Sequence, residues 1–138
     1  MSHAIIRQLF EGRLNGWAAT RTPALRIAYE DVAFTPADGE TYLKAFAIPA
    51  GTGSNTLGGD HRVYTGVFQV SIVTPSGSGP GSAEGVVDEL ADLYPLYLRL
   101  NRADFEVIVL TPVEPSPGIP DDTTYTVAAS FQYRADTN

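Results

Sequence analysis

The strongest constraint on the fold is the alternation of apolar and polar residues over residues 124–134. A period of two places successive side chains on opposite faces of an extended chain. We therefore predict an antiparallel strand with one face in the core and one toward solvent. The inward set is Tyr125, Val127, Ala129, Phe131 and Tyr133, and the outward set is Thr124, Thr126, Ser130, Gln132 and Arg134.

Two amphipathic helices are predicted, over residues 4–18 and 82–94, because their apolar residues recur every three or four positions. Ser2 is the expected N-cap of the first helix, and Pro95 should end the second near Tyr94. The apolar faces are Ile6, Phe10, Leu14 and Trp17 in the first, and Val86, Leu90, Leu93 and Tyr97 in the second.

Further strands are expected at residues 25–29, 41–48, 63–73, 98–100 and 105–110. Within residues 63–73, Gly66 marks a bulge or a close approach of backbone. A turn is expected at Asn101–Asp104. Residues 50–61 are rich in Gly, Ser, Thr and Asn, and residues 111–123 hold four of the ten prolines, so both are expected to be irregular.

The order of helix, strands, helix and strands favours an α+β fold. We predict a mostly antiparallel sheet with two helices packed on one face, as a single domain over residues 1–138. A chain of 138 residues with 43% hydrophobic residues is long enough for one core.

Charge and composition exclude several classes of function. Nine basic residues stand against sixteen acidic ones, a net charge of −7, which disfavours an electrostatic grip on nucleic acid or on an anionic membrane. The absence of cysteine excludes thiol catalysis, zinc ribbons and disulfides. No apolar run could span a bilayer. The first residues lack the layout of a signal peptide, so we expect the chain to stay where it is made.

Three patterns could carry chemistry, and we favour a structural interpretation of each. Asp60-His61 resembles a general base with its carboxylate but lacks a defined nucleophile, so a solvated loop pair is favoured. Residues 76–82 lie where phosphate-binding loops occur, but they lack a Gly-Lys-Ser/Thr motif and Pro80 has no N–H, so we favour a flexible connector. The carboxylates that could offer oxygen ligands to Ca²⁺ or Mg²⁺ fit the solvated face of the second helix; they are Glu84, Asp88, Glu89 and Asp92.

We therefore predict no catalytic residue, no cofactor and no metal, and we do not expect an enzyme. Four tyrosines fit either the core or a protein interface, and periodicity does not separate the two. They are Tyr64, Tyr97, Tyr125 and Tyr133.

Several segments carry a resemblance when they are read in order. Residues 27–43 run from a short strand through an acidic turn into the loop Thr35–Gly39, and residues 64–79 run from an aromatic-rich strand into a Pro-x-Gly-x-Gly helix start. Tyr94-Pro95 ends the second helix, and residues 131–136 close the last strand. Over nearly the whole chain, this resembles the phage tail terminator-like family, the tail-completion proteins of siphophages and prophages. That family often has Phe in place of Tyr94 and Asn in place of Asp31.

The resemblance implies an α+β subunit that assembles into a hexameric ring on the last ring of the tail tube. Such a ring ends tube polymerisation and offers a face to head-completion proteins for head–tail joining, while genome DNA passes through as cargo. It implies a structural protein of the virion tail, made and assembled in the cytoplasm of the bacterial host. Whether the free chain is a monomer or a hexamer stays open.

On this interpretation, the loops 50–62 and 111–123 contact the tube or the neighbouring subunit. The candidate interface residues are Leu57, Asp60, His61, Arg62, Tyr64, Pro115, Ile119 and Asp121. Deletion of residues 52–59 should leave the monomer folded and abolish capping.

Two alternatives stay open. One is another phage tail structural protein, either a tube subunit or a head–tail connector; tube proteins polymerise through long hairpins, and we predict no long hairpin arm here. The other is a small nucleotide- or metal-binding protein that uses Gly77–Gly81 and Asp60-His61. A thermal-shift screen with nucleotides and divalent metals tests the second alternative.

Overall fold

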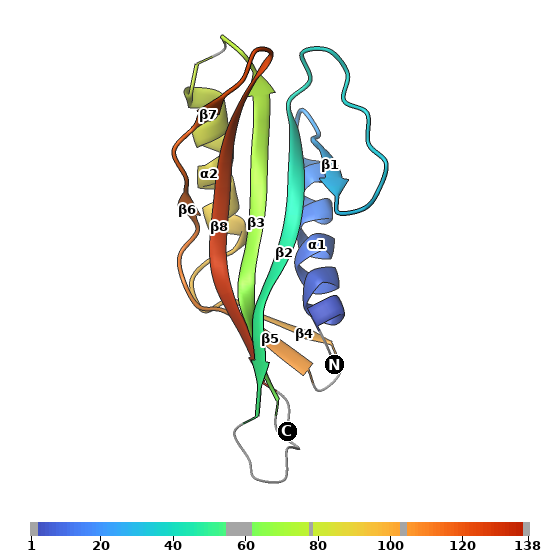
Figure 1. Cartoon of the computed structure of the whole chain (residues 1–138), viewed down its shortest axis with the longest axis vertical. Helices are drawn as coiled ribbons and strands as arrows, with labels where there is room; N and C mark the ends of the chain where they lie inside the picture. The colour runs from blue at the N-terminus through green and yellow to red at the C-terminus, as the bar shows by residue number, and fades with distance from the viewer. Residues whose placement is uncertain (1–2, 55–61, 78, 103–104, 137–138) are drawn as a thin grey trace.

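Three long strands form the centre of a sheet, and two helices cover one of its faces (Figure 1). The computed structural model describes residues 3–54, 62–77, 79–102 and 105–136. The elements are α1 (His3–Thr20), β1 (Arg26–Tyr29), β2 (Tyr42–Gly53), β3 (Val63–Pro75), α2 (Gly81–Leu93), β4 (Arg99–Arg102), β5 (Phe105–Val109), β6 (Glu114–Pro115), β7 (Ile119–Pro120) and β8 (Thr124–Asp136). None of the helices in this part of the chain is long and apolar enough to cross a membrane.

The sheet has the strand order β1-β2-β3-β8-β5-β4, with β6 and β7 also paired to β8. Strand β1 runs parallel to β2, and every other pairing is antiparallel. In Figure 1, α1 lies behind β1 and β2, and α2 lies behind the side of the sheet that carries β6 and β7. The predicted α+β fold, with two helices on one face of a mostly antiparallel sheet, is confirmed.

The core lies between the helices and the inward faces of β3 and β8. The alternation over residues 124–134 is confirmed, since Val127, Ala129, Phe131 and Tyr133 are buried and Tyr125 is half-buried. On the helices, the buried residues are Ile6, Phe10, Leu14 and Ala18 in α1 and Ala83, Val86, Val87 and Leu90 in α2. The expected apolar face of α1 is therefore correct except at Trp17, which is half-buried while Ala18 takes the core position.

An aromatic cluster fills the centre of this core. The ring of Phe10 lies 5.2 Å from that of Phe68, 5.1 Å from that of Phe131 and 5.6 Å from that of Tyr133. Tyr94 closes the cluster from the end of α2, 4.9 Å from Phe131. Tilted and edge-on aromatic pairs at these separations contribute beyond their buried area.

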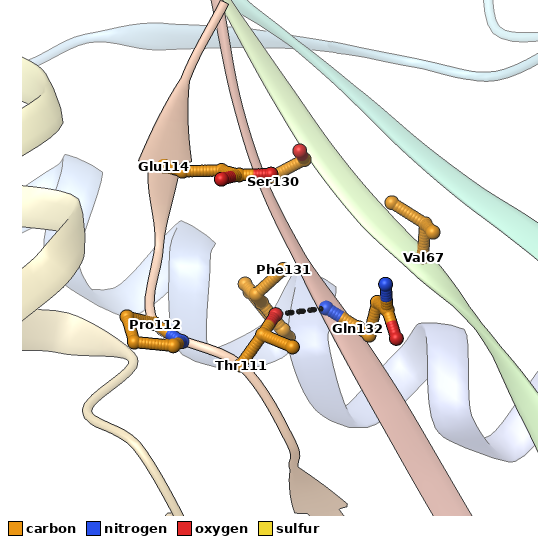
Figure 2. A pocket seen from close by; sticks show the side chains of 7 residues that line it. All are labelled: Val67, Thr111, Pro112, Glu114, Ser130, Phe131 and Gln132. Atoms are coloured by element: carbon orange, nitrogen blue, oxygen red, sulfur yellow. Dashed lines mark hydrogen bonds between the residues drawn. The ribbon is translucent and has the colours of Figure 1, made fainter.

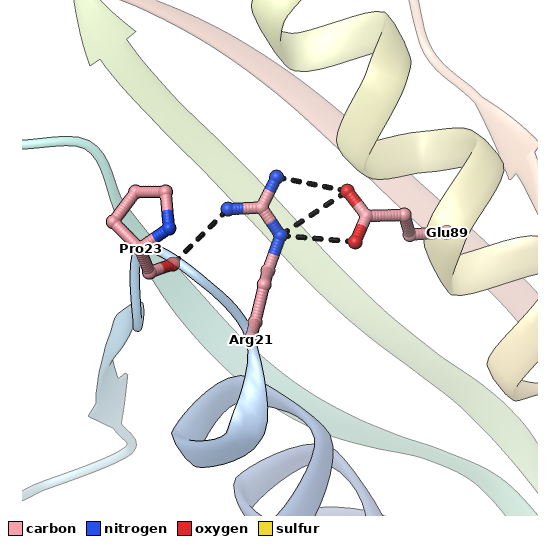
Figure 3. Close-up of polar contacts among 3 residues, drawn as sticks. All are labelled: Arg21, Pro23 and Glu89. Carbon is pink, nitrogen blue, oxygen red and sulfur yellow. Dashed lines mark hydrogen bonds and ion pairs between the residues drawn. The ribbon is translucent and has the colours of Figure 1, made fainter.

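Side chains of α1 and of the residue after it bind α2 and fix how the helices lie on the sheet. Arg13 Nε donates to the backbone oxygen of Leu93 at 2.7 Å. The guanidinium of Arg21 binds both carboxylate oxygens of Glu89 and also the backbone oxygen of Pro23 (Figure 3). One of the four carboxylates predicted on α2 thus serves a link between helices.

The prediction of an irregular segment over residues 50–61 is wrong at its start. Strand β2 continues to Gly53, which faces Val63 of β3, after a change of register between Pro49 and Gly51. That bulge hides the strand, because one extra residue shifts the alternation of side chains by one position. Strands β2 and β3 therefore form a longer hairpin than the sequence predicts, but β8 pairs β3 from Val63 to Pro75, so the described part of this hairpin lies within the sheet and is not a projecting arm.

Gly66 lies where two strands leave no room for a side chain. A Cβ atom there would lie 2.4 Å from the hydroxyl oxygen of Tyr133 and 2.5 Å from the backbone oxygen of Ile48. The predicted close approach of backbone is confirmed.

Helix α2 ends where Pro95 was expected to end it, but Tyr97 does not share its apolar face. The last helical residue is Leu93, and Tyr97 lies outside the helix with φ +67° and with 64% of the residue exposed. The spacing of apolar residues predicts that Tyr97 continues the apolar face of the helix, but Pro95 ends the helix before Tyr97 is reached. Asn101 and Arg102, half of the turn expected at Asn101–Asp104, belong to β4 instead, and the other two residues lie outside the described part of the chain.

The outer edge of β2 carries two features beyond its short pairing with β1. The backbone N–H of Ala47 donates to the carboxylate of Glu30 at 2.8 Å and so faces away from β3. Pro49, two residues further, lies on the same outward side of an alternating strand and has no N–H.

Candidate protein–protein interface

Residues 110–123 form a strap along the outer edge of β8; the segment is irregular as predicted, except for the two short strands β6 and β7. Strands β6 and β7 pair with β8 at Ser130 to Ala129 and at Thr126 to Tyr125. Both strands are short, and two hydroxyl oxygens of the strap accept further bonds from backbone N–H groups of β8. The oxygen of Thr111 accepts from Gln132 N at 2.8 Å, and that of Ser116 accepts from Ala128 N at 3.1 Å.

The strap presents three of the predicted interface residues at the surface. Pro115 and Asp121 are exposed, and so is 65% of the residue Ile119. The backbone N–H of Asp121 donates to Thr124 O at 2.7 Å, which fixes the turn into β8. The side chain of Ile119 is therefore accessible to a partner on this segment.

A groove lies between the strap and the helix-free face of the sheet (Figure 2). It encloses about 380 Å³, and its lining residues are Val67, Thr111, Pro112, Glu114, Ser130, Phe131 and Gln132. Glu114 is the one charged residue among them. A phosphate or nucleotide would find no cation in this lining, whereas amide, hydroxyl and apolar groups together fit a polypeptide.

Arg62 and Tyr64 lie at the opposite end of the sheet from Ile119. Tyr64 faces Ala135 in β8, whereas Ile119 faces Thr126, nine positions away and hence about 30 Å at ~3.4 Å per residue. The structure therefore separates the predicted residues into two groups instead of bringing them into one site. Leu57, Asp60 and His61 lie outside the described residues.

Tyr64 has an intramolecular role that its strand pattern did not reveal. Its half-buried ring meets His3 edge-on at 5.1 Å and Phe105 at 5.9 Å. The imidazole of His3 also lies within hydrogen-bond distance of the hydroxyl groups of Tyr133 and Thr52, each at 3.1 Å. His3 thus joins the start of α1 to the hairpin, a contact that sequence spacing could not show.

The ionisable groups show no arrangement typical of catalysis in the part of the chain that is described. Within it, no group of three or more His, Asp or Glu residues is placed to hold a metal ion. The pKa of Glu40 is lowered to about 2, mainly by its hydrogen bonds from Arg26 and also by one from Ala37 N–H. Burial raises the pKa of Tyr94 in the aromatic cluster. Both pKa shifts have structural causes: for Glu40 a contact in a loop, and for Tyr94 burial in the core.

A second hollow lies beside β1, on the flank opposite the strap. It encloses about 440 Å³ and is lined by Arg7, Glu11, Tyr29, Glu30, Asp31 and Val32. Burial raises the pKa of Glu11, an effect that Arg7 opposes and Glu30 reinforces. This hollow was not among the sequence predictions, because residues from α1 and from the end of β1 meet only in the folded chain.

Comparison with known proteins gives one consistent assignment. A family model described as phage tail terminator protein matches residues 5–133. Nine chains of solved structures match, and one of them, which carries no functional name, is 43% identical with a TM-score of 0.83. That match covers 98% of this chain and 96% of the other. Curated proteins give no significant match.

Proposed function

This chain belongs to the phage tail terminator protein family, and on that premise we propose that it forms a hexameric ring on the end of the tail tube. The family is one of phage structural proteins, so the coarse role, a structural component of a phage tail, follows from membership. In the proposed role, the ring stops tube polymerisation and presents its other face to head-completion proteins. Genome DNA passes through the ring, and assembly takes place in the bacterial cytoplasm.

The observation that carries this proposal is the family match over residues 5–133. The surfaces of the chain support it. The strap exposes Ile119, and the groove beside Glu114 has a lining that suits a polypeptide. Among the described residues, no metal-ligating group competes with an interaction role.

Capping of purified tail tubes tests the proposal. Tube protein is polymerised with and without an excess of this chain, and tube lengths are measured by negative-stain microscopy. We expect short tubes of uniform length that stop growing. The cap should have a native mass near six times the 14.8 kDa of one chain. Tubes that keep growing at saturating concentrations would refute the terminator role.

The long β2–β3 hairpin leaves one alternative function open, that of a tube subunit, because tube subunits polymerise through long hairpins. The same experiment separates the two roles. A tube subunit on its own forms open-ended tubes, whereas a terminator forms closed rings or remains unassembled until a tube end is present.

A further inference from the structure

The first residue of α1 carries a side chain that joins the helix to the end of the sheet where β2 and β3 pair beyond the bulge (Figure 1). The Nδ1 atom of His3 lies 3.1 Å from the hydroxyl oxygen of Tyr133 in β8, and the Nε2 atom lies 3.1 Å from that of Thr52 in β2. The imidazole also meets the ring of Tyr64 in β3 edge-on at 5.1 Å. One imidazole therefore contacts three strands of the sheet.

The protons of these contacts can be placed because the hydroxyl group of Tyr133 has one partner. Among the described residues it is bound by His3 alone, and Tyr133 is 1% exposed. Burial raises the pKa of this phenol, so the group keeps its proton and needs an acceptor. The acceptor is Nδ1 of the neutral imidazole. The ring then carries its own proton on Nε2 and donates it to Thr52.

The charged groups around the start of α1 offer no counter-ion to a protonated His3. One turn later in α1 lies Arg7, whose carboxylate partner is Glu11 at 3.8 Å. From β4, Arg102 donates to the side chain of Gln8 at 2.6 Å. Both of these charged groups are cations. In the part of the chain that is described, no carboxylate forms an ion pair with His3.

A proton on the bound imidazole of His3 would be opposed in two further ways. The N-terminus of a helix disfavours a cation. A proton on Nδ1 would also take the acceptor away from the buried O–H of Tyr133. The strands packed against the ring present the hydroxyl of Thr52 and the phenols of Tyr64 and Tyr133, which are not anions near neutral pH. An imidazole released into water meets neither obstacle, so acid favours release.

We propose that His3 is a pH-sensitive latch, which holds the first turn of α1 on the sheet while the imidazole is neutral and releases it when the ring is protonated. Histidine is the side chain that ordinarily changes charge between about pH 5 and 8. The opening stops at Ile6, which is fully buried and anchors the rest of the helix. It uncovers the side of the Tyr64 ring that faces His3. This latch does not depend on the proposed function.

Amide hydrogen exchange of the whole chain, followed by NMR, tests the latch. The N–H groups of Arg7 and Gln8 report on the first turn, because in an α-helix they bond the carbonyl groups of His3 and Ala4. We expect their protection factors, corrected for the intrinsic exchange rate at each pH, to fall about tenfold from about pH 7.5 to about pH 5. The protection factor of Leu14, in the middle of the helix, should stay level. Level factors for Arg7 and Gln8 would overturn the latch.

Two substitutions identify the group that titrates. His3→Gln removes the ionisable ring, so the protection factors of Arg7 and Gln8 should be equal at both pH values. His61→Gln removes the other histidine of the chain and should leave the native response. A fall that persists in His3→Gln would overturn the proposal and point to Glu11, whose pKa is raised by burial.

Tyr133→Phe tests the role of the buried acceptor bond. This variant keeps the ring but has no O–H to lose its acceptor, so the fall in protection between the two pH values should shrink to about threefold or less. Tyr94→Phe is the matched control, because it removes another buried phenol O–H from the same aromatic cluster and should keep the native response. An equal response in the two variants would overturn the assignment of Tyr133 to the latch.

Discussion

The hydroxyl group of Tyr94 donates a hydrogen bond of 2.7 Å to the backbone oxygen of Phe10, inside the core and between the two helices. Tyr94 is 1% exposed and Phe10 is fully buried. The bond therefore links the end of α2 to the middle of α1 where no water competes for it.

Replacement Tyr94→Phe removes this bond and keeps the ring. We expect a loss of about 1 kcal/mol in the free energy of unfolding, the usual net value of such a bond, measured by urea denaturation. Tyr97→Phe removes a hydroxyl from an exposed ring and should change stability by less than ~0.5 kcal/mol. Equal effects of the two variants would contradict a role for the buried bond.

Burial raises the pKa of the Tyr94 phenol above its ordinary value. The folded pKa exceeds the unfolded one, so this contribution to stability is complete below the unfolded pKa of about 10 and is lost as pH rises above it. The unmodified chain should therefore lose stability above about pH 10 more steeply than Tyr94→Phe. Thermal unfolding from pH 8 to 11 measures the difference, and parallel curves would refute it.

Gly66→Ala should destabilise the chain, because its new methyl group collides with Tyr133 and with the backbone of Ile48. Overpacking of this kind costs about 1–3 kcal/mol. Gly12→Ala is the matched control, since it adds the same methyl group to α1 with nothing within 4 Å. It should stabilise the chain by up to ~1 kcal/mol through helix propensity. The two variants should thus shift the urea midpoint in opposite directions.

The carboxylate of Glu40 should titrate near pH 2. Its pKa is lowered by Arg26, so the stability it contributes is present above the unfolded pKa of about 4.5 and is lost as pH falls toward 2. In Arg26→Gln the midpoint should move back toward 4.5, as followed by NMR of the side-chain carboxyl. Lys44→Gln, at an exposed position of β2, should leave it in place. An unmoved midpoint in Arg26→Gln would exclude the ion pair as the cause.

Ile119→Asp tests the strap as a contact surface. The side chain is exposed, so stability should change by less than ~0.5 kcal/mol. Capping of tail tubes should weaken at least tenfold, because a charge replaces an apolar contact. Ala19→Asp places the same charge at an exposed position of α1 and should leave capping intact. Equal loss in both variants would indicate a general charge effect.

The sequence predicts the elements whose pattern is set by burial of one face. Residues 124–134 and the helix around Phe10 alternate or recur as a buried face requires, and both predictions are confirmed. The bulge after Pro49 and the strap break this rule. A bulge shifts the alternation by one residue, and in the strap the hydroxyl oxygens of Thr111 and Ser116 accept bonds from backbone N–H groups of β8, which no alternation of side chains reveals.

The residues of the candidate site are harder to predict from the sequence than the fold is. Tyr64 and Ile119 were grouped as interface residues, but the strand register places them at opposite ends of the sheet. The hollow beside β1 joins Arg7 of α1 to Val32, which are far apart in the sequence. Such groupings depend on which strands pair, and a single sequence does not give that order. Which of these residues contact a partner remains a prediction.

The outward N–H of Ala47 is occupied by Glu30, and Pro49 supplies none; on the far side of the sheet, the strap occupies the edge of β8. Unpaired strand edges are the usual starting points of amyloid-like growth. Along these two edges an incoming strand would find few free partners among the described residues, so any contact between copies there would be made by side chains. A protein that caps a polymer, as proposed for this chain, would gain from this arrangement, because it could be made in excess without becoming a fibre itself.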